Sequence, residues 1–295
     1  MKIPEPEAAT LRAALDGRLE AIDALIATIQ PGVYRLAVHA LGHRDDAADA
    51  TQEILLKVVT HLAGFRGEAA FSTWVWRVAY NHLASARTRK AESPEVSLED
   101  IAERLDQGLE FAAELARMRG EPMPLTPEDK LEAQQLALAC SQSMLMALDR
   151  EQRLACILDA VVGLDSATAA EVLGITPEAY RQRLSRARSR LDAFVGRTCG
   201  LASPEAACRC ERQLPAVRHR ARSEGGSFGA DPGAVVARPD AEQLEAERQL
   251  AALARVSDAA AVLRAHPAYR GPQALHGAIR TVLVREGLLD RGASA

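Results

Sequence analysis

The sequence contains few aromatic residues, few cysteines and no long apolar run. Only 4% of its 295 residues are Phe, Trp or Tyr, and five are Cys. No stretch approaches the ~20 apolar residues that span a bilayer, and the first residues lack the apolar core of a signal peptide. These absences predict a cytoplasmic protein that contacts no membrane. Five cysteines in so long a chain do not make a disulfide scaffold, so a cluster of them favours metal binding or redox chemistry.

Strand patterns are also scarce. Apolar residues recur at helical spacing between Gly and Pro breaks, and no segment alternates apolar and polar residues convincingly. At about 150 residues per domain, the length favours two domains. We therefore expect an all-α protein with two small helical domains, a linker and a helical C-terminal extension. The expected segments are a first domain over 8–92, an acidic linker over 93–126, a second domain over 127–197, a Cys- and Arg-rich segment over 198–222, and a flexible stretch with a helical tail over 223–295.

Gly and Pro positions divide the domains into helices. Pro31 and Gly42 mark two breaks, and Asp45 is a natural N-cap for the helix that follows. The predicted helices cover 8–29, 33–42, 46–63 and 72–90 in the first domain, 98–118 in the linker, and 128–148, 150–162, 166–173 and 177–195 in the second domain.

Catalytic motifs are missing. The sequence has no nucleophile elbow, no phosphate-binding glycine loop and no paired carboxylates in an apolar context. We expect a protein that is not an enzyme and that leaves catalysis to a partner.

Charge is distributed unevenly along the chain. The chain has a net charge of −4, but its segments differ. The net charge is +4 over residues 69–91, −8 over 92–132 and +7 over 177–222. Two basic blocks separated by an acidic one predict contact with phosphate at two places. Arg-rich helices can also be ordinary solvated faces, so the motifs must decide.

A helix-turn-helix pattern begins at Ser166, in SATAAEVLGITPEAYRQRLSRARSRL. Gly174 allows the positive φ of the turn, Ala170 is small where the helices cross, and Pro177 opens the second helix. The predicted buried stripe of that helix is Tyr180, Leu184, Ala187 and Leu191. Arg and Gln in its first two turns can hydrogen-bond base edges, at about 1–3 kcal/mol for each bidentate pair. The residues expected to contact DNA are Glu178, Arg181, Gln182, Arg183, Ser185, Arg186 and Arg188. An Arg-rich amphipathic helix in a bundle is the alternative.

The first domain joins an amphipathic helix to an aromatic and basic segment. The helix over 46–63 leaves Asp49, Gln52, Glu53 and Lys57 on its polar side. The segment FRGEAAFSTWVWRVAYNHLASARTRK follows, and it carries no acid from residue 69 to 91. Aromatic rings stack on unpaired bases, which contributes roughly 1–3 kcal/mol per base, and Lys and Arg side chains bind the phosphates of the nucleic-acid backbone. Trp74 shares a helical face with Val78, so we assign it to the core.

Three segments resemble regions two and four of the extracytoplasmic-function (ECF) sigma factors of bacterial RNA polymerase. In chain order they are DDAADATQEILLKV, FRGEAAFSTWVWRVAYN and LDREQRLACILDAVVGLDSATAAEVLGITPEAYRQRLSRARSRL. The resemblance covers roughly residues 20–92 and 128–197, about half of the chain. Two motif blocks in the right order are harder to obtain by chance than one helix-turn-helix.

The resemblance implies binding to core RNA polymerase and to promoter DNA. The polar residues Asp49, Gln52, Glu53 and Lys57 would dock on the polymerase clamp helices. The helix from Pro177 would read the duplex minus-thirty-five element, and the acidic linker would occupy a basic channel of the polymerase. An anti-sigma factor would be a further partner. The residues expected at the melted minus-ten element, where a flipped base is captured, are Phe65, Arg66, Phe71, Ser72, Thr73, Trp76, Arg77, Tyr80 and Asn81.

Three of the five cysteines follow the second helix closely. Cys199, Cys208 and Cys210 have the spacing C-x8-C-x-C, and a turn at Ser203-Pro204 would bring the first back to the pair. The three thiols could hold zinc or copper, with His219 or a solvent molecule as a fourth ligand, although no cofactor is required. Nearby arginines would lower the thiol pKa values. A metal-free turn and a redox pair are the alternatives.

The other two cysteines, Cys140 and Cys156, lie in apolar helical stretches and are assigned to core packing. The Cys-rich extension is similar to that of a sigma group that senses a metal through its C-terminus. Two rival functions remain. A metal-responsive regulator acting on duplex DNA would have no need of the aromatic and basic block at 71–90. A thiol redox enzyme built on Cys208 and Cys210 would lack a C-x-x-C motif at a helix start.

Overall fold

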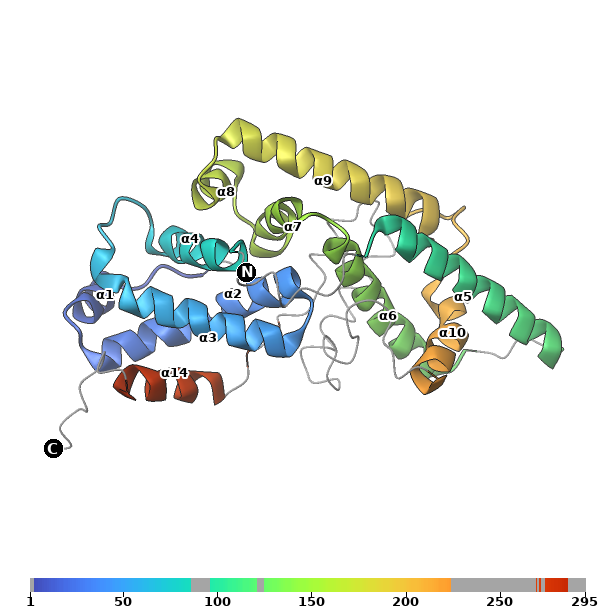
Figure 1. Ribbon diagram of the computed structural model, residues 1–295, viewed down its shortest axis with the longest axis horizontal. Coiled ribbons are helices and arrows are strands. Elements are labelled where there is room, and N and C mark those ends of the chain that lie inside the picture. Colours follow the sequence, from blue (N-terminus) through green and yellow to red (C-terminus); the bar gives the residue numbers. More distant parts are fainter. Residues whose placement is uncertain are drawn as a thin grey trace. The chain divides into compact units, whose positions relative to one another are not determined.

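A computed structural model describes residues 3–85, 96–120, 125–223, 269, 271 and 274–285. These residues form helices joined by turns and loops (Figure 1), and the one β-type contact among them is an isolated bridge between Cys199 and Cys208. The predicted all-α fold with a C-terminal extension is confirmed.

The chain divides into two compact units. The first consists of residues 1–91, 157–181 and 268–295, and the second of residues 92–156 and 182–267. This division passes through helices, so it does not follow the domain limits expected from the sequence. Those limits stay predictions.

The N-terminal helices of the first unit break at a glycine and not at the proline. Gly17 has a φ of 81°, whereas Pro31 lies inside a helix of 23 residues. Glycine adopts positive φ without strain, and burial of Ile29 and Val33 on both sides of Pro31 outweighs its one lost hydrogen bond. The predicted break between 8–29 and 33–42 is therefore wrong. The helices of this unit are α1 (Ala8–Leu15), α2 (Leu19–Leu41), α3 (Arg44–Thr60), α4 (Phe71–Leu83), α8 (Ser166–Leu173) and α14 (Ala274–Arg285).

The start of α3 also differs from the prediction. His43 is the extended N-cap residue, and Asp45 lies within the first turn beside Asp46. Gly42 ends α2 in the left-handed conformation, which leaves only His43 to reverse the chain. Asp45 is therefore not the N-cap, although its negative charge still interacts favourably with the positive N-terminal end of the helix dipole.

The core of the first unit is apolar and encloses one tryptophan. Ile54, Val75 and Trp76 are at most 1% exposed. The N-terminal segment closes this core through Ile3, which lies where a side chain on Gly32 would stand. Residue 32 must therefore stay small for the segment to pack.

The C-terminal tail packs on the same unit. α14 lies alongside α2 and α3 (Figure 1), and Ile279 is fully buried. The ring of Tyr269 meets that of His39 edge-on, with 5.3 Å between centroids, and the guanidinium carbon of Arg44 lies 5.7 Å from the Tyr269 centroid. The predicted helical tail is thus present over 274–285, while most of 223–295 lies outside the described residues.

The second unit contains most of the acidic segment as a regular helix. α5 begins with a capping box, in which the Ser97 hydroxyl accepts from the Asp100 N–H and the Asp100 carboxylate accepts from the Ser97 N–H. It packs against α6 and α10, so the expected linker helix is an integral part of this unit. The helices here are α5 (Leu98–Arg119), α6 (Pro127–Met146), α7 (Arg150–Ile157), most of α9 (Pro177–Thr198) and α10 (Cys210–Ser223).

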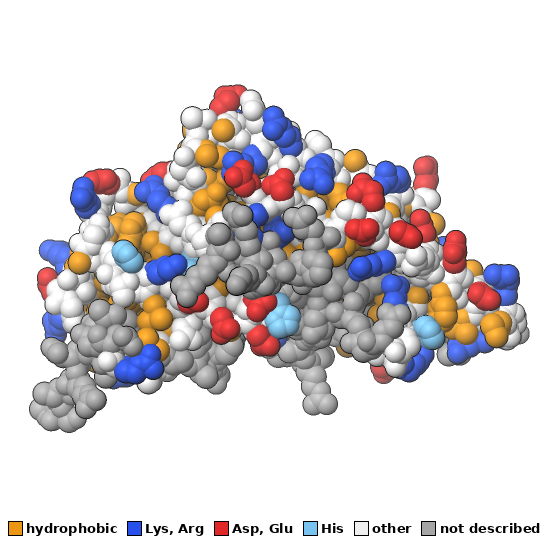
Figure 2. All heavy atoms as spheres, viewed as in Figure 1, with side chains coloured by type: hydrophobic (Ala, Val, Ile, Leu, Met, Phe, Trp, Pro, Cys, Tyr) orange, Lys and Arg blue, Asp and Glu red, His pale blue; other side chains and the backbone are white. Residues whose placement is uncertain are grey.

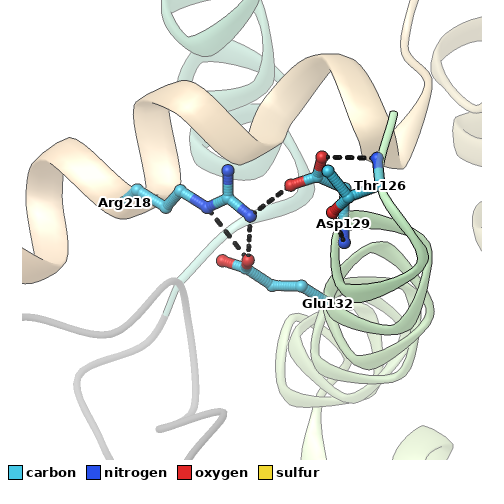
Figure 3. A network of polar contacts seen from close by, with 4 residues as sticks. All are labelled: Thr126, Asp129, Glu132 and Arg218. Carbon is cyan, nitrogen blue, oxygen red and sulfur yellow. Dashed lines mark hydrogen bonds and ion pairs between the residues drawn. The ribbon is translucent and has the colours of Figure 1, made fainter. Parts of the chain in front are cut away.

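Arg218 joins α10 to the first two turns of α6 (Figure 3). Its Nε donates to Glu132 Oε2 at 2.9 Å, and its Nη2 donates to both Glu132 and Asp129. Asp129 also accepts the N–H of Thr126 at 2.9 Å within a second capping box. The Thr126 N–H, followed by Arg218, lowers the pKa of Asp129.

Candidate polymerase and nucleic-acid interface

The polar side of α3 is the surface expected to bind polymerase. Asp49, Glu53 and Lys57 are exposed and Gln52 is partly exposed, as predicted. On the opposite side of the helix Ala47, Ala50, Ile54 and Val58 are buried, as is Leu62 just beyond its end. The helix therefore presents both charge signs on one accessible face.

His82 of α4 connects to this face, which the sequence alone did not reveal. Lys57 Nζ donates to His82 Nδ1 at 2.9 Å, and Glu53 Oε2 lies 3.9 Å from the same nitrogen. Because an ammonium group can only donate, Nδ1 carries no proton in this arrangement. These contacts hold Lys57 and Glu53 of α3 against the buried His82 of α4. The polar side of α3 is therefore fixed next to α4.

The residues expected at the melted minus-ten element fall into two environments. Phe71, Thr73 and Trp76 are buried, so in this structure they support the surface and do not form it. The exposed or partly exposed members of the set are Phe65, Arg66, Ser72, Arg77, Tyr80 and Asn81. Arg87, Arg89 and Lys90 lie outside the described residues.

The two tryptophans exchange the positions predicted for them. Trp76 is the core residue, and Trp74 is partly exposed. Trp74 packs with Phe65 and Phe71, with ring centroids 5.5 and 5.8 Å from its own. The assignment of Trp74 to the core was wrong because α4 turns the face of Val75 and Ala79 toward the interior.

Glu5 caps the N-terminus of α4. Its two carboxylate oxygens accept the backbone N–H groups of Phe71 and Ser72, each at 3.0 Å. A carboxylate stabilises a helix N-terminus because it satisfies free N–H groups and faces the positive end of the dipole. Glu5 lies 66 residues away in sequence, so no local pattern predicted this contact.

The helix-turn-helix has the turn that its sequence predicts. Gly174 adopts a φ of 65°, and its N–H and that of Ile175 donate to carbonyls of α8. Asp165 caps α8 by accepting N–H groups of Ala167 and Thr168, each at 3.0 Å. The Thr168 N–H is the main cause of the lowered pKa of Asp165. Ala170 is buried where the prediction puts the helix crossing.

The outer face of α9 is polar and accessible. The predicted stripe of Tyr180, Leu184, Ala187 and Leu191 is buried. The charged side chains of α9 are mostly arginines, with acidic side chains only at Glu178 and Asp192, and basic side chains gather over this part of the surface (Figure 2). The exposed members of the expected DNA-binding set are Glu178, Arg181, Gln182, Ser185, Arg186 and Arg188.

Arg183 differs from the other arginines of α9. Its side chain is 20% exposed, and its Nη2 lies 2.8 Å from Glu151 Oε2. Arg181 instead pairs with Glu178 one turn away, at 3.1 Å, with both side chains in solvent. Exposed pairs of this kind contribute little and open readily, so Arg181 is freer to contact DNA than Arg183.

The cysteine segment folds back as the sequence predicts. The N–H of Gly200 donates to the carbonyl of Cys208 at 2.9 Å, which places Cys199 beside Cys208. Thiols suit zinc and copper, yet nowhere in the described ranges do three or more His, Cys, Asp or Glu side chains form a group that could hold a metal ion.

Two details of the cysteine prediction need correction. His219 lies nine residues along α10 from Cys210, about 13 Å at 1.5 Å per residue, and its ring stacks on Phe111. It is therefore not placed as a fourth ligand. The pKa values of Cys208 and Cys210 are raised, mainly by burial, which exceeds the lowering by Arg209 at Cys208.

None of the helices in the described part of the chain is long and apolar enough to cross a membrane.

Comparison with known proteins matches both parts of the interface. Residues 25–92 match sigma-70 region 2, and residues 138–191 match sigma-70 region 4. The ECF RNA polymerase sigma factor SigM of Mycobacterium tuberculosis is 27% identical over 190 residues, which are 64% of this chain and 85% of SigM. The RNA polymerase sigma-H factor of Pseudomonas aeruginosa is 29% identical over 180 residues, which are 60% of this chain and 86% of that protein.

A solved structure is also similar. The structure of CnrH in complex with the cytosolic domain of CnrY matches with a TM-score of 0.42 and 22% identity, and the match covers 63% of this chain and 95% of CnrH. The two sigma-70 regions occur in order, and the similarity to these two sigma factors, one of them an ECF sigma factor, extends over most of their length. Together these matches support the identification of the chain as an ECF sigma factor of bacterial RNA polymerase.

Proposed function

We propose that this RNA polymerase sigma factor recognises a promoter at two separated elements while its α3 binds core polymerase. α9 reads the minus-thirty-five element as duplex. The loop 64–71 and α4 hold the minus-ten element as a melted strand. Sigma factors are transcription initiation factors, so the chemistry of RNA synthesis belongs to the polymerase.

The outer face of α9 carries the proposal for duplex recognition. Arg181, Gln182 and Arg186 are exposed opposite a fully buried stripe, directly after a glycine turn. A helix held in this way can enter a major groove, where Arg binds guanine and Gln binds adenine through paired hydrogen bonds. Arg183 contributes less to base contact because Glu151 holds its guanidinium group.

The accessible part of α4 supports the proposal for the melted strand. Phe65 and Tyr80 offer aromatic surface, and Arg66 and Arg77 supply charge for the phosphates. Arg77 Nη2 is 3.0 Å from Glu171, and both side chains are more than 40% exposed, so DNA can displace this contact at small cost.

Transcription in vitro with core polymerase tests the proposal most directly. The purified chain should direct initiation at a defined start site, and Gln182→Ala should weaken minus-thirty-five protection roughly ten-fold by loss of one paired base contact. Arg197→Ala is the matched control, because Arg197 is exposed on the same helix beyond the motif. Unchanged footprints for Gln182→Ala, or no initiation at any promoter, would contradict the proposal.

The α3 face has a separate test. Asp49→Lys reverses a charge on the exposed side and should weaken binding to core polymerase. Asp16→Lys makes the same change at an exposed position outside α3 and should leave binding unchanged. Equal affinities of the two variants would remove α3 as the polymerase contact.

We further propose that the cytoplasmic protein is metal-regulated through Cys199, Cys208 and Cys210, which would bind zinc or copper. The support is the hydrogen bond between Gly200 and Cys208, which brings the segments of the first two thiols together. An anti-sigma factor is a further proposed partner, since CnrH is found in complex with CnrY. Activity with and without a chelator tests the metal, and co-purification with the polymerase or another protein tests the partners.

A further inference from the structure

A histidine is buried where α4 packs against α3. His82 is 7% exposed and lies one turn beyond Ala79, on the face of α4 that enters the core of the first unit. An imidazole buried without a polar partner costs free energy, whereas an apolar side chain in the same place does not. The position therefore depends on the contacts that the ring makes.

The ring of His82 contacts the polar side of α3. Lys57 Nζ lies 2.9 Å from His82 Nδ1, and Glu53 Oε2 lies 3.9 Å from the same nitrogen. Since the ammonium group can only donate, Nδ1 accepts, and the proton of the neutral ring is on Nε2. His82 thus meets one basic and one acidic side chain of the set expected to bind polymerase.

The contact fixes a side chain that would otherwise move freely. Lys57 is exposed, and an exposed lysine ordinarily samples many rotamers. The hydrogen bond to a buried ring holds its ammonium group in one place, one helical turn from Glu53. An ammonium group has three donors, so one bond to His82 does not use up its capacity. A charge held in its bound position loses less conformational entropy when a partner docks.

We propose that His82 is a positioning residue for polymerase binding: it holds the ammonium group of Lys57, near Glu53, in the arrangement that core polymerase contacts. This inference rests on the proposed role of α3 and adds to it a buried residue of α4. It also accounts for a side chain with an acceptor nitrogen at a place in the core that an apolar side chain would fill without cost.

Binding of core polymerase to the full chain tests the proposal. His82→Phe keeps a flat ring but removes the acceptor, and we expect the affinity to fall roughly ten-fold, the upper range for the ordering of one side chain. His82→Asn keeps an acceptor, because its Oδ1 stands close to the position of Nδ1, and should restore the affinity to within about three-fold of the parent chain. His61→Phe, the same change at an exposed histidine of the first unit, should bind as the parent chain does.

A double-variant comparison shows whether His82 acts through Lys57. Lys57→Met removes the ammonium group and should weaken polymerase binding by itself. In that background His82→Phe should have no further effect, because the group that it positions is gone. A second loss of the same size in the double variant would overturn the proposal and would make His82 a part of the packing alone.

Folding is measured beside binding, by the tryptophan fluorescence of the first unit under urea. An unchanged unfolding midpoint together with lower affinity in His82→Phe supports a positioning role. If the midpoint also falls, the Lys57→Met background still decides, because a packing defect would weaken binding in both backgrounds.

The results separate this inference from the proposed role of α3. Equal affinity of His82→Phe and the parent chain, with binding weakened in Asp49→Lys, would overturn the role of His82 and keep α3 as the polymerase contact. Unchanged binding in Asp49→Lys, Lys57→Met and His82→Phe alike would overturn both, and would leave the proposal for duplex recognition by α9 untouched.

Discussion

Both units of the molecule have an apolar core, but they differ in the side chains that are most prominent inside it. In the first, large apolar side chains such as Trp76, Phe71 and Ile54 fill the interior. In the second, buried polar side chains also link helices: Arg153 donates to carbonyls at the end of α6, and Gln213 of α10 donates to the Leu105 carbonyl within α5. Apolar packing tolerates changes of pH and salt, whereas hydrogen-bonded and charged contacts fail when one partner is lost. The surfaces expected to bind polymerase and melted DNA are built on the first unit, and the cysteine cluster belongs to the second.

The tryptophans make this comparison measurable. Both Trp74 and Trp76 belong to the first unit, so tryptophan fluorescence reports on that unit alone, while far-UV circular dichroism reports on both.

Trp76→Ala should have the largest effect on the first unit. Trp76 is 1% exposed, and its removal leaves a cavity beside Gly32, so we expect a loss of about 3–5 kcal/mol in unfolding free energy. The fluorescence of Trp74 under urea measures the change. Trp74→Ala is the control: its ring is partly exposed, and its loss should cost clearly less. Equal losses in the two variants would show that Trp76 is not the centre of the core.

Arg153→Met should have the next largest effect, in the second unit. The Arg153 side chain donates to the carbonyls of Leu145, Met146 and Leu148, each at 3.1 Å, where α6 ends. Methionine fills similar space but leaves these carbonyls without that donor, which should cost about 3 kcal/mol. Circular dichroism should show earlier unfolding, while the fluorescence transition stays in place. Arg197→Met, at an exposed position, should change neither transition, and a shift of the fluorescence midpoint in Arg153→Met would mean that the units do not unfold separately.

Local patterns predicted most of the fold, because they depend on neighbours in the sequence. The helix-turn-helix followed from Gly174, Pro177 and the buried stripe of α9, all within one segment. The exposed face of α3 was predicted from the helical spacing of its apolar and polar residues. The errors arose where distant parts of the chain decide. Which tryptophan is buried depends on how α4 packs, and Pro31 is accommodated because both halves of α2 enter one core.

Contacts between distant residues could not be predicted for the same reason. Glu5 caps α4 across 66 residues, and Gln213 of α10 donates to the carbonyl of Leu105 in α5 across 108 residues. The pKa direction of the cysteines was wrong because arginine count is visible in the sequence, whereas burial is not. Sequence distance hides contacts of this kind until the helices are packed.

Ile279→Val should show a smaller effect that defines the limit of the first unit. Ile279 is fully buried although it belongs to the C-terminal tail. Removal of one methyl group from a packed site costs about 1 kcal/mol, so the fluorescence transition should move to lower urea. Thr281→Ala alters an exposed position of the same helix and should leave it unchanged. If Ile279→Val also leaves the transition unchanged, the tail is not part of the cooperative unit.

The smallest expected effect is a difference in the pH and salt dependence of stability between two variants of the second unit. Asp129 and Asp100 both cap a helix, but only Asp129 also binds Arg218, and the pKa of each is lowered. A carboxylate with a lowered folded pKa stabilises the fold fully above its unfolded pKa, about 4, and this contribution disappears as the pH falls through the folded value. The stability lost in Asp129→Asn should therefore be constant above about pH 5 and vanish in stronger acid. Salt screens an ion pair between two full charges more than the contact of one carboxylate with a helix N-terminus, so added salt should reduce the loss in Asp129→Asn more than that in Asp100→Asn. Equal salt dependence in the circular dichroism melts of the two variants would show that Arg218 adds nothing beyond the capping box.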